Sequence, residues 1–347
     1  MNNLAPTQQQ LGWKPFFQQQ LTLDELTELN IGRVIEQHRD RAVVMSDQGQ
    51  QGLTFTSYEE RVCVGDWVLF DDELRLRKIL DRQSLFERKA PGTKVTTQLI
   101  AANIDTVMIV SSLNYDFNLS RIERYLTLAR EAMVEPVILL TKADLCDDAD
   151  AKREQVQQLD PMLEVHTLNA LNEQDIQSLE PHCRNGKTIA FMGSSGVGKS
   201  TLVNRLLGFE SMQTGGIRED DSKGRHTTTH RALKIMPTGG ILMDTPGMRE
   251  LQLGSSEHGV SETFSEITEL AQQCRFSNCS HGNEPGCAVQ RALRDGQLEE
   301  RRLMSYQKLL KEQALNGATL AEKRSKDRAL GKMINSAQTA KRSKKGY

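Results

Sequence analysis

Short alternating runs of apolar and polar residues fill the chain from Ile31 to about Arg88. They read GRVIEQ, RAVVMSD, GLTFTS, GDWVLFD and LRLRKIL, with glycine or aspartate near the breaks. Alternation with a period of two is typical of strands that have one buried face. Five short strands in roughly 60 residues predict a small β-barrel. An OB-fold is our first interpretation, and an SH3-like barrel is the alternative.

A different pattern runs from about Gln98 to Leu251, where apolar runs of strand length alternate with helical stretches. The apolar runs are Thr106–Val110, Pro136–Leu140, Thr188–Met192 and Ile241–Met243, and the helical stretches lie around Leu119–Met133 and Ser200–Leu207. This alternation predicts an α/β domain with a mostly parallel sheet covered by helices. Residues 232–236 and 240–243 predict an added antiparallel hairpin. Beyond Ser261 the pattern is helical.

The segment 193–200, GSSGVGKS, matches the phosphate-binding pattern G-x-x-x-x-G-K-[ST]. It follows an apolar run and opens a predicted helix, which is the context that this motif requires. Its glycines allow backbone angles that turn several N–H groups toward phosphate oxygens. We expect Lys199 to place its charge near the β- and γ-phosphates and the Ser200 hydroxyl to bind Mg²⁺. The segment therefore predicts a nucleotide site.

Two further motifs indicate a guanine nucleotide. Asp244-Thr-Pro-Gly247 ends an apolar run. At this place an aspartate can help to bind Mg²⁺, and a glycine N–H can donate a hydrogen bond to the γ-phosphate. Thr141-Lys-Ala-Asp144 ends another run, and the Asp144 carboxylate can accept hydrogen bonds from the N1–H and N2–H₂ edge of guanine. The stem of Lys142 can cover the ring. Adenine lacks this edge, so the motif argues against the enzymatic alternative, a P-loop ATPase or kinase.

The order of these motifs differs from that of a small GTPase, in which the phosphate loop comes first and the base-reading motif last. Here Lys142 and Asp144 precede Gly193. A closed sheet accepts such an order when the old termini are adjacent and joined, and new ends open elsewhere. The sequence therefore predicts a circularly permuted GTPase domain.

Three of the six cysteines lie in one short segment together with a histidine: Cys274, Cys279, His281 and Cys287. Zn²⁺ binds three thiolates and one imidazole in a closed tetrahedron, with no position left open for catalysis. The spacing differs from that of two C-x₂-C knuckles. We predict a structural metal site. Six cysteines are too few for a disulfide scaffold in a chain of this length, so we also expect the reducing environment of the cytosol.

Composition fits a soluble globular protein of two or three domains, with 347 residues, 37% hydrophobic residues and a net charge of −2. No apolar run approaches the roughly 18 residues of a membrane helix, and the N-terminus is no secretory signal. We therefore expect a cytoplasmic protein without membrane contact. Residues 322–347 carry nine basic and two acidic side chains, a balance that attracts phosphate backbones. The barrel, the metal segment and this tail favour an RNA partner.

With TKAD, GSSGVGKST, GRHTTT (224–229) and DTPG in this order, the chain resembles the RsgA (YjeQ) family of circularly permuted bacterial GTPases from about residue 31 to 320. The resemblance implies GTP hydrolysis to GDP and phosphate during late maturation of the small (30S) ribosomal subunit, with stimulation by that subunit and contact with its 16S rRNA. It implies one structural Zn²⁺ at the cysteine–histidine set and Mg²⁺ with GTP. We expect a monomer. The expected organisation is a flexible extension (1–30), an OB-fold barrel (31–90), the permuted GTPase domain (96–252), a zinc-binding helical domain (261–320) and a basic tail (321–347).

The family also implies a fifth nucleotide-binding element at Leu168-Asn169-Ala170, which lacks the usual Ser-Ala pair, and Thr141 stands where GTPases commonly have Asn. The expected magnesium ligands are Ser200, Thr228 and Asp244. The expected GTP-binding residues are Thr141, Lys142, Ala143, Asp144, Ala170, Gly193, Ser194, Ser195, Gly196, Val197, Gly198, Lys199, Ser200, Thr201, Asp244 and Gly247.

The group that triggers hydrolysis is left open by the sequence. Many GTPases place a glutamine after D-x-x-G to orient the attacking water, but Met248 occupies this position. Either His226 orients or deprotonates the water, acting with Lys199 as a catalytic residue, or a partner supplies the missing group. The non-enzymatic alternative is an RNA-binding assembly factor that uses GTP only as a ligand.

Overall fold

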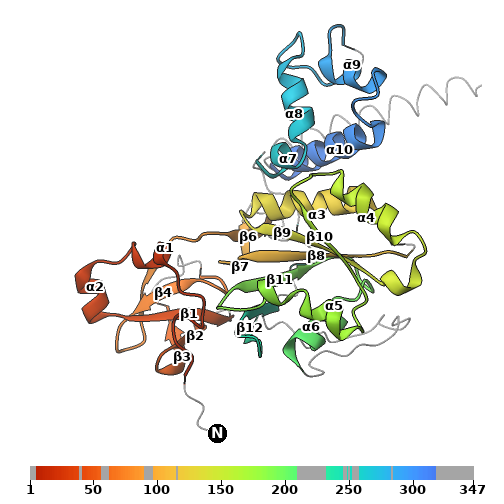
Figure 1. Ribbon diagram of the computed structural model, residues 1–347. Coiled ribbons are helices and arrows are strands. Elements are labelled where there is room, and N and C mark those ends of the chain that lie inside the picture. The colour runs from red at the N-terminus through yellow and green to blue at the C-terminus, as the bar shows by residue number, and fades with distance from the viewer. Residues whose placement is uncertain are drawn as a thin grey trace, which may run out of the picture.

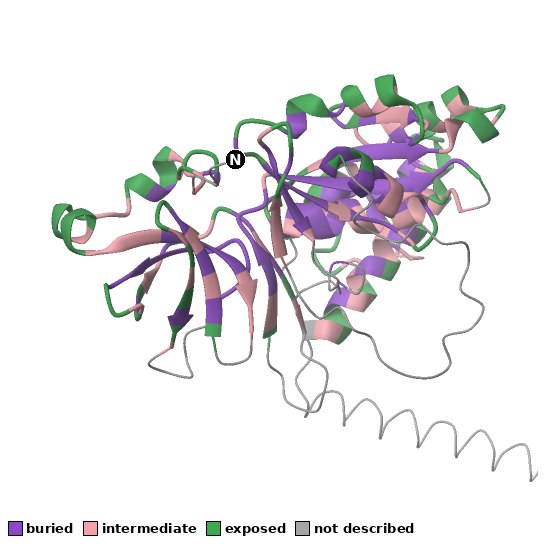
Figure 2. Cartoon of the chain, turned by 90° about the horizontal axis from the view of Figure 1, so that it is seen from below, coloured by how far each residue is buried: buried purple, intermediate pink, exposed green. Residues whose placement is uncertain are grey.

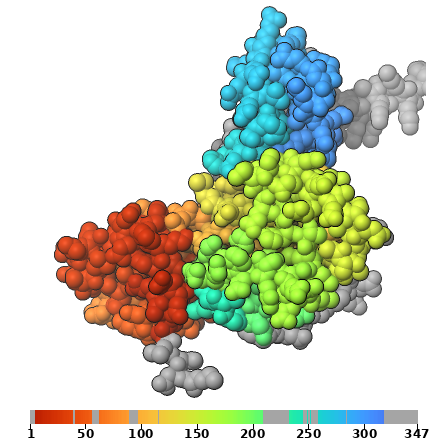
Figure 3. Space-filling model, viewed as in Figure 1, coloured from red at the N-terminus to blue at the C-terminus, as the bar shows by residue number. Residues whose placement is uncertain are grey.

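The computed structural model describes residues 5–38, 41–55, 62–89, 97–114, 116–208, 232–244, 248, 251, 258–282 and 284–317. The space-filling view shows three lobes, formed by the N-terminal, middle and C-terminal parts of the chain (Figure 3). Predictions on His226, Thr228, Gly247 and the basic tail concern positions outside the described residues. Within the described ranges, no helix has the length and apolar character that crossing a membrane requires.

The N-terminal lobe is built from antiparallel strands. They are β1 (Asn30–Gln37), β2 (Arg41–Ser46), β3 (Gly49–Thr54), β4 (Trp67–Phe70) and β5 (Leu76–Ile79). β1 pairs with both β2 and β4, β2 pairs with β3, and β4 pairs with β5. A parallel bridge between Thr54 and Arg75 brings the end of β3 beside β5. Val34, Val44 and Leu53 are fully buried inside, as the alternating pattern predicts.

The Gln-rich N-terminal segment packs against this lobe, which differs from the flexible extension that its composition predicts. It contains α1 (Pro15–Gln18) and α2 (Leu23–Glu28). Phe17 is 1% exposed, and its ring centroid lies 5.9 Å from that of Trp67. The Trp13 ring meets Trp67 edge-on at 4.7 Å. Apolar side chains spaced irregularly along the segment thus cover one end of the lobe. Because their spacing has no helix or strand period, the sequence pattern does not predict this packing.

The middle lobe contains the predicted parallel sheet. Its strands follow the spatial order β10 (Glu164–Leu168), β9 (Glu135–Thr141), β8 (Thr106–Ser112), β11 (Thr188–Met192), β13 (Ile241–Asp244) and β12 (Ala232–Ile235). β12 and β13 form the predicted antiparallel hairpin, and the other neighbours are parallel. α3 (Leu119–Glu131) and α4 (Ala149–Gln157) cover one face of the sheet, and α5 (Glu173–Gln177) and α6 (Lys199–Leu207) lie on the other (Figure 1). The central strands are buried on both faces (Figure 2).

The N-terminal and middle lobes share one mixed sheet, because β12 pairs with β1 at Glu36 and Ala232. A buried cation strengthens this junction. The Arg33 guanidinium donates to the carbonyl of Leu11 at 2.6 Å and to the Thr188 hydroxyl at 2.8 Å. Burial lowers the pKa of Arg33 to about 10, and these bonds replace the water that the cation loses. A separate hairpin, β6 (Leu85–Lys89) and β7 (Thr97–Ala102), was not among the predicted elements.

The C-terminal lobe consists of α7 (His258–Thr263), α8 (Ser265–Gln272), α9 (Ala288–Arg294) and α10 (Glu300–Gly317), and it stands on α3 (Figure 1). A Cβ on Gly259 would lie 2.3 Å from the carbonyl oxygen of Thr127, so α7 and α3 approach closely. The fully buried Glu123 carboxylate of α3 accepts hydrogen bonds from Arg301 and Arg302 of α10. The predicted helical character beyond Ser261 is confirmed in the described part of this region, which extends to residue 317.

Candidate nucleotide site and metal site

The phosphate loop connects β11 to α6, as its motif predicts. Gly193, Gly196 and Gly198 all have positive φ, at 146°, 78° and 102°, a conformation that residues other than glycine rarely adopt. The loop therefore reverses tightly and leads into the N-terminus of α6, where unpaired N–H groups favour an anion. Lys199, the first residue of α6, is 8% exposed and donates to the carbonyl oxygen of Gly193 at 2.7 Å.

Gly193→Ala tests the geometry of this loop. Its Cβ would lie 2.3 Å from the carbonyl oxygen of Val110 on β8, whereas a Cβ on Gly196 meets nothing within 4 Å. Both substitutions place an alanine at a positive φ, which costs about 1–2 kcal/mol of conformational free energy. Only Gly193→Ala also makes the new Cβ collide with a buried strand. We expect Gly193→Ala to lower the free energy of unfolding more than Gly196→Ala and to weaken GTP binding. Equal effects in urea unfolding would show that the collision is absent.

The TKAD motif contacts the phosphate loop directly. Thr141, the last residue of β9, is fully buried and donates from its hydroxyl to the carbonyl oxygen of Val197 at 2.6 Å. Lys142 has φ of 60° and reaches the Gly196 carbonyl oxygen at 3.0 Å. The chain then turns into the short helix η1 (Ala143–Leu145), which leaves Asp144 exposed at the carboxyl edge of the sheet. Thr141 thus supplies a tie between two motifs that are distant in sequence.

The expected fifth element also lies at this edge. Ala170 follows β10, is 9% exposed and belongs to the same buried cluster as Val197 and Leu202. Asn169 starts a turn in which its side-chain oxygen accepts from the Leu171 N–H at 2.9 Å. Arg205 of α6 donates to the Leu171 carbonyl oxygen at 3.4 Å. The structure therefore brings this loop beside the helix that follows the phosphate loop.

Asp244 ends β13, which is separated from β9 and its TKAD motif by the two strands β8 and β11. Its carboxylate lies 3.8 Å from the Lys234 ammonium group on the paired strand. A carboxylate here and the Ser200 hydroxyl at the start of α6 are oxygen ligands of the kind that Mg²⁺ prefers. Met248 is 3% exposed and packs in the large apolar core of the middle and C-terminal lobes.

Arg121 is a residue of this site that sequence reasoning missed. It lies in the first turn of α3, donates to the Ser194 hydroxyl of the phosphate loop at 2.9 Å and pairs with Asp116. Ser194 is thereby held from outside the loop. The sequence signals this contact only by placing an arginine three residues after the helix-capping Asn118, in the first helix that follows β8.

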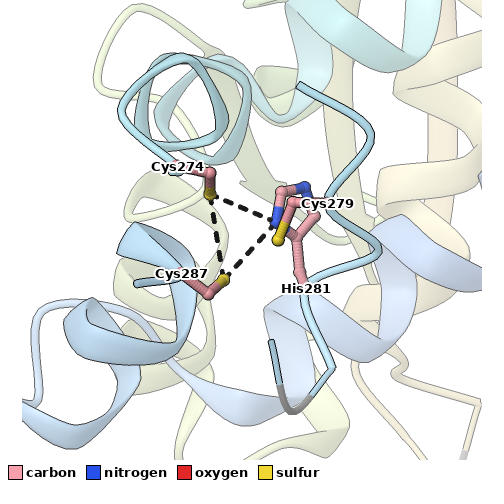
Figure 4. Close-up of side chains that lie close together, drawn as sticks. All are labelled: Cys274, Cys279, His281 and Cys287. Carbon is pink, nitrogen blue, oxygen red and sulfur yellow. Dashed lines mark hydrogen bonds between the residues drawn. The ribbon is translucent and has the colours of Figure 1, made fainter. Parts of the chain in front are cut away.

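The cysteine–histidine set comes together as predicted (Figure 4). Sγ of Cys274 lies 3.8 Å from Sγ of Cys287, and Nδ1 of His281 lies 3.7 Å from each sulfur. All four ligand atoms, including Sγ of Cys279, lie within 4.8 Å of one another. Zn–S bonds of about 2.3 Å and Zn–N bonds of about 2.0–2.1 Å place tetrahedral ligands about 3.6–3.8 Å apart. The residues therefore fit a zinc ion.

Neighbouring groups hold these ligands in place. Gln290 donates from its side chain to the His281 carbonyl oxygen at 2.7 Å, and its backbone N–H points to Sγ of Cys287 at 3.4 Å. His281 has φ of 58°, and the loop around it is braced by Glu284, which accepts from the Gly282 N–H at 2.7 Å. Hydrogen bonds lower the pKa of Glu284 to about 2, and the bond from the Ser280 side chain has the largest effect.

The phosphate loop and the TKAD loop lie at one edge of a parallel sheet, in permuted order. This arrangement is that of a circularly permuted P-loop GTPase. The family model for the RsgA GTPase matches residues 79–254. The small ribosomal subunit biogenesis GTPase RsgA 2 of Vibrio parahaemolyticus is 57% identical over 96% of this chain and 93% of its own length. The chain therefore belongs to the RsgA GTPase family.

Solved structures agree with this fold. The crystal structure of YjeQ from Thermotoga maritima is 25% identical, with a TM-score of 0.62, and the match covers 82% of this chain and 98% of that one. YloQ, described as a circularly permuted GTPase, has a TM-score of 0.59 at 24% identity, with 84% and 96% coverage. The permutation expected from the motif order is thus shared with these structures.

Proposed function

We propose that this protein hydrolyses GTP on the small ribosomal subunit during late maturation, in the cytoplasm and as a monomer. The observation that carries the proposal is the bond from Thr141 to Val197, which joins a guanine-reading loop to a phosphate loop in a chain of the RsgA GTPase family. The relative from Vibrio parahaemolyticus is named for small ribosomal subunit biogenesis. Family and geometry therefore support the same activity.

In this proposal the nucleotide binds at the carboxyl edge of the parallel strands in the middle lobe. The phosphate loop (193–201) with Lys199 holds the phosphates, Asp144 reads guanine beside Ala170, and Gly247 meets the γ-phosphate. Mg²⁺, held by Ser200, Thr228 and Asp244, would neutralise charge on the β- and γ-phosphates. Either His226, which lies outside the described residues, or the partner orients the attacking water.

We further propose that the N-terminal lobe is an OB-fold and that it contacts 16S rRNA together with the zinc-binding lobe and the basic tail. The strand order β1–β2–β3–β5–β4, closed through Thr54 and Arg75, supports a five-stranded barrel of this kind. We also propose a GTPase domain over 96–252, a zinc-binding helical domain over 261–320 and a basic tail over 321–347, of which the tail lies outside the described residues.

Steady-state GTP hydrolysis with and without 30S subunits tests the proposal, with ATP and 50S subunits as controls. We expect a slow rate alone, because Met248 offers no group to orient water, and stimulation of at least about tenfold by 30S alone. A flat rate with 30S, or equal stimulation by 50S, would contradict the proposed partner.

Met248 motivates a second candidate, in which the protein is an RNA-binding assembly factor and GTP is only a ligand. Its apolar side chain is buried in the core, so it cannot orient the attacking water as the glutamine of many GTPases does. Single-turnover phosphate release separates the two cases. Release of one phosphate per site with 30S supports hydrolysis, whereas bound GTP that stays intact supports the second candidate.

A further inference from the structure

Three side chains of types that can bind a metal ion meet at the outer strand of the sheet, away from both sites above. Glu164 and His166 belong to β10, and residues at i and i+2 of a strand face the same side. His182 comes from the short helix η2 (Glu180–His182), in the connection from α5 to β11. We call these three residues the edge cluster. It lies at the beginning of β10, whereas Ala170 follows the other end of that strand.

The ligand atoms of the edge cluster converge. Oε1 of Glu164 lies 2.7 Å from Nε2 of His166 and 2.9 Å from Nε2 of His182. The two imidazole planes are nearly perpendicular, at 87°, with centroids 6.3 Å apart. All three ligand atoms lie within 4.8 Å of one another. Adjacent ligands of a tetrahedral zinc ion, at about 2.0–2.2 Å from the metal, lie about 3.3–3.5 Å apart. A bound ion would therefore move the Glu164 carboxylate outward by about half an ångström, and this side chain is exposed enough to move.

Burial divides the cluster into a fixed side and an open side. The His182 side chain is only 10% exposed and that of His166 is 23% exposed, whereas Glu164 is 46% exposed. The imidazoles are therefore held by the protein, and the carboxylate faces solvent, from which an ion can enter. Nδ1 of His182 is buried and has no hydrogen-bond partner among the described residues.

We propose that the edge cluster is a second metal site, which binds Zn²⁺ or a similar divalent transition-metal ion. Two imidazoles and one carboxylate select such ions, because Mg²⁺ and Ca²⁺ prefer sites made of oxygen ligands. Three protein ligands leave positions open to water. Binding through Nε2 moves the His182 ring proton to the buried Nδ1, and this makes the site weaker than the cysteine–histidine set.

The bound ion would join η2 to β10 and so fix the connection that leads into β11 and the phosphate loop. A ligand that binds only the folded state raises its stability. Zinc at this site should therefore raise the unfolding temperature, a readout that does not depend on GTP hydrolysis or on ribosomal subunits.

Equilibrium dialysis of the full-length protein against micromolar Zn²⁺, followed by elemental analysis, tests the proposal. We expect His166→Ala and His182→Ala to bind one zinc fewer per chain than the wild type, with affinity at this site reduced at least about tenfold. His258→Ala is the matched control, because His258 pairs with Glu262 one turn along α7 and lies outside the edge cluster. It should keep the wild-type zinc content.

Thermal unfolding provides the second measurement. Added Zn²⁺ should raise the midpoint by about 2–4 °C in the wild type and in His258→Ala, and less in His166→Ala. If His182→Ala does not fold, His166→Ala decides, since His166 lies on an outer strand and is less buried. Equal zinc content in the wild type and in His166→Ala would overturn the proposal and leave a hydrogen-bonded cluster only.

Discussion

Asp144→Asn should reduce the affinity for GTP by about 10²–10⁴-fold. The carboxylate accepts two hydrogen bonds from guanine in the proposed complex, and each charge-assisted bond contributes about 1.5–3 kcal/mol. An asparagine amide turns one of these acceptors into a donor that faces a donor of the base. The loss should be partly recovered with XTP, since xanthine carries an oxygen where guanine carries its amino group. Titration with fluorescent GTP and XTP analogues measures both affinities.

Asp147→Asn is the matched control for this prediction. Asp147 is exposed in the same loop, three residues further on, and the substitution changes the local charge by the same amount. It should leave GTP affinity within about twofold. Equal losses in both variants would mean that net charge, rather than contact with the base, governs binding. Unchanged affinity in Asp144→Asn would remove the guanine-reading role from TKAD.

Much of the fold could be predicted because its signals are local. The buried strands β8, β9, β11 and β13 carry continuous apolar runs, and their observed bounds lie within two residues of the predicted ones. β10 was missed because its burial is uneven, with only Val165 and Leu168 buried. The N-terminal helices were missed for a related reason. They are short, and Phe17 is buried only because Trp67 lies beside it in three dimensions.

In the candidate site, too, the features set by local sequence could be predicted, and the contacts between distant residues could not. Residue types at fixed spacing identified the phosphate loop, TKAD and the cysteine–histidine set, because their chemistry depends on neighbours in sequence. The ties between them join distant residues: Thr141 contacts Val197, and Arg121 contacts Ser194. No spacing rule predicts such pairs. The edge cluster carries no spacing signal either, because Glu164 and His166 lie on β10 whereas His182 lies on η2.

Cys287→Ser should abolish zinc binding and unfold the region around α8 and α9. These helices have eight and seven residues, too short to be stable alone. Cys287 is also the N-cap of α9, so its loss removes a ligand and a helix cap together. Structural zinc contributes about 10–16 kcal/mol of binding free energy, which is comparable with the whole stability of a domain, about 5–15 kcal/mol. Zinc content and limited proteolysis of residues 273–299 measure the result.

Cys183→Ala is the control, because it removes a buried cysteine that is not part of the metal set. Burial raises the pKa of Cys183 to about 12, so it stays a thiol and cannot act as a thiolate ligand at neutral pH. This variant should keep its zinc. In Cys287→Ser, GTP affinity should stay within about threefold of the wild type, because the nucleotide site lies on the sheet. A parallel loss of GTP affinity would show instead that the contacts of α3, which touches both Ser194 and the C-terminal lobe, make the two sites one cooperative unit.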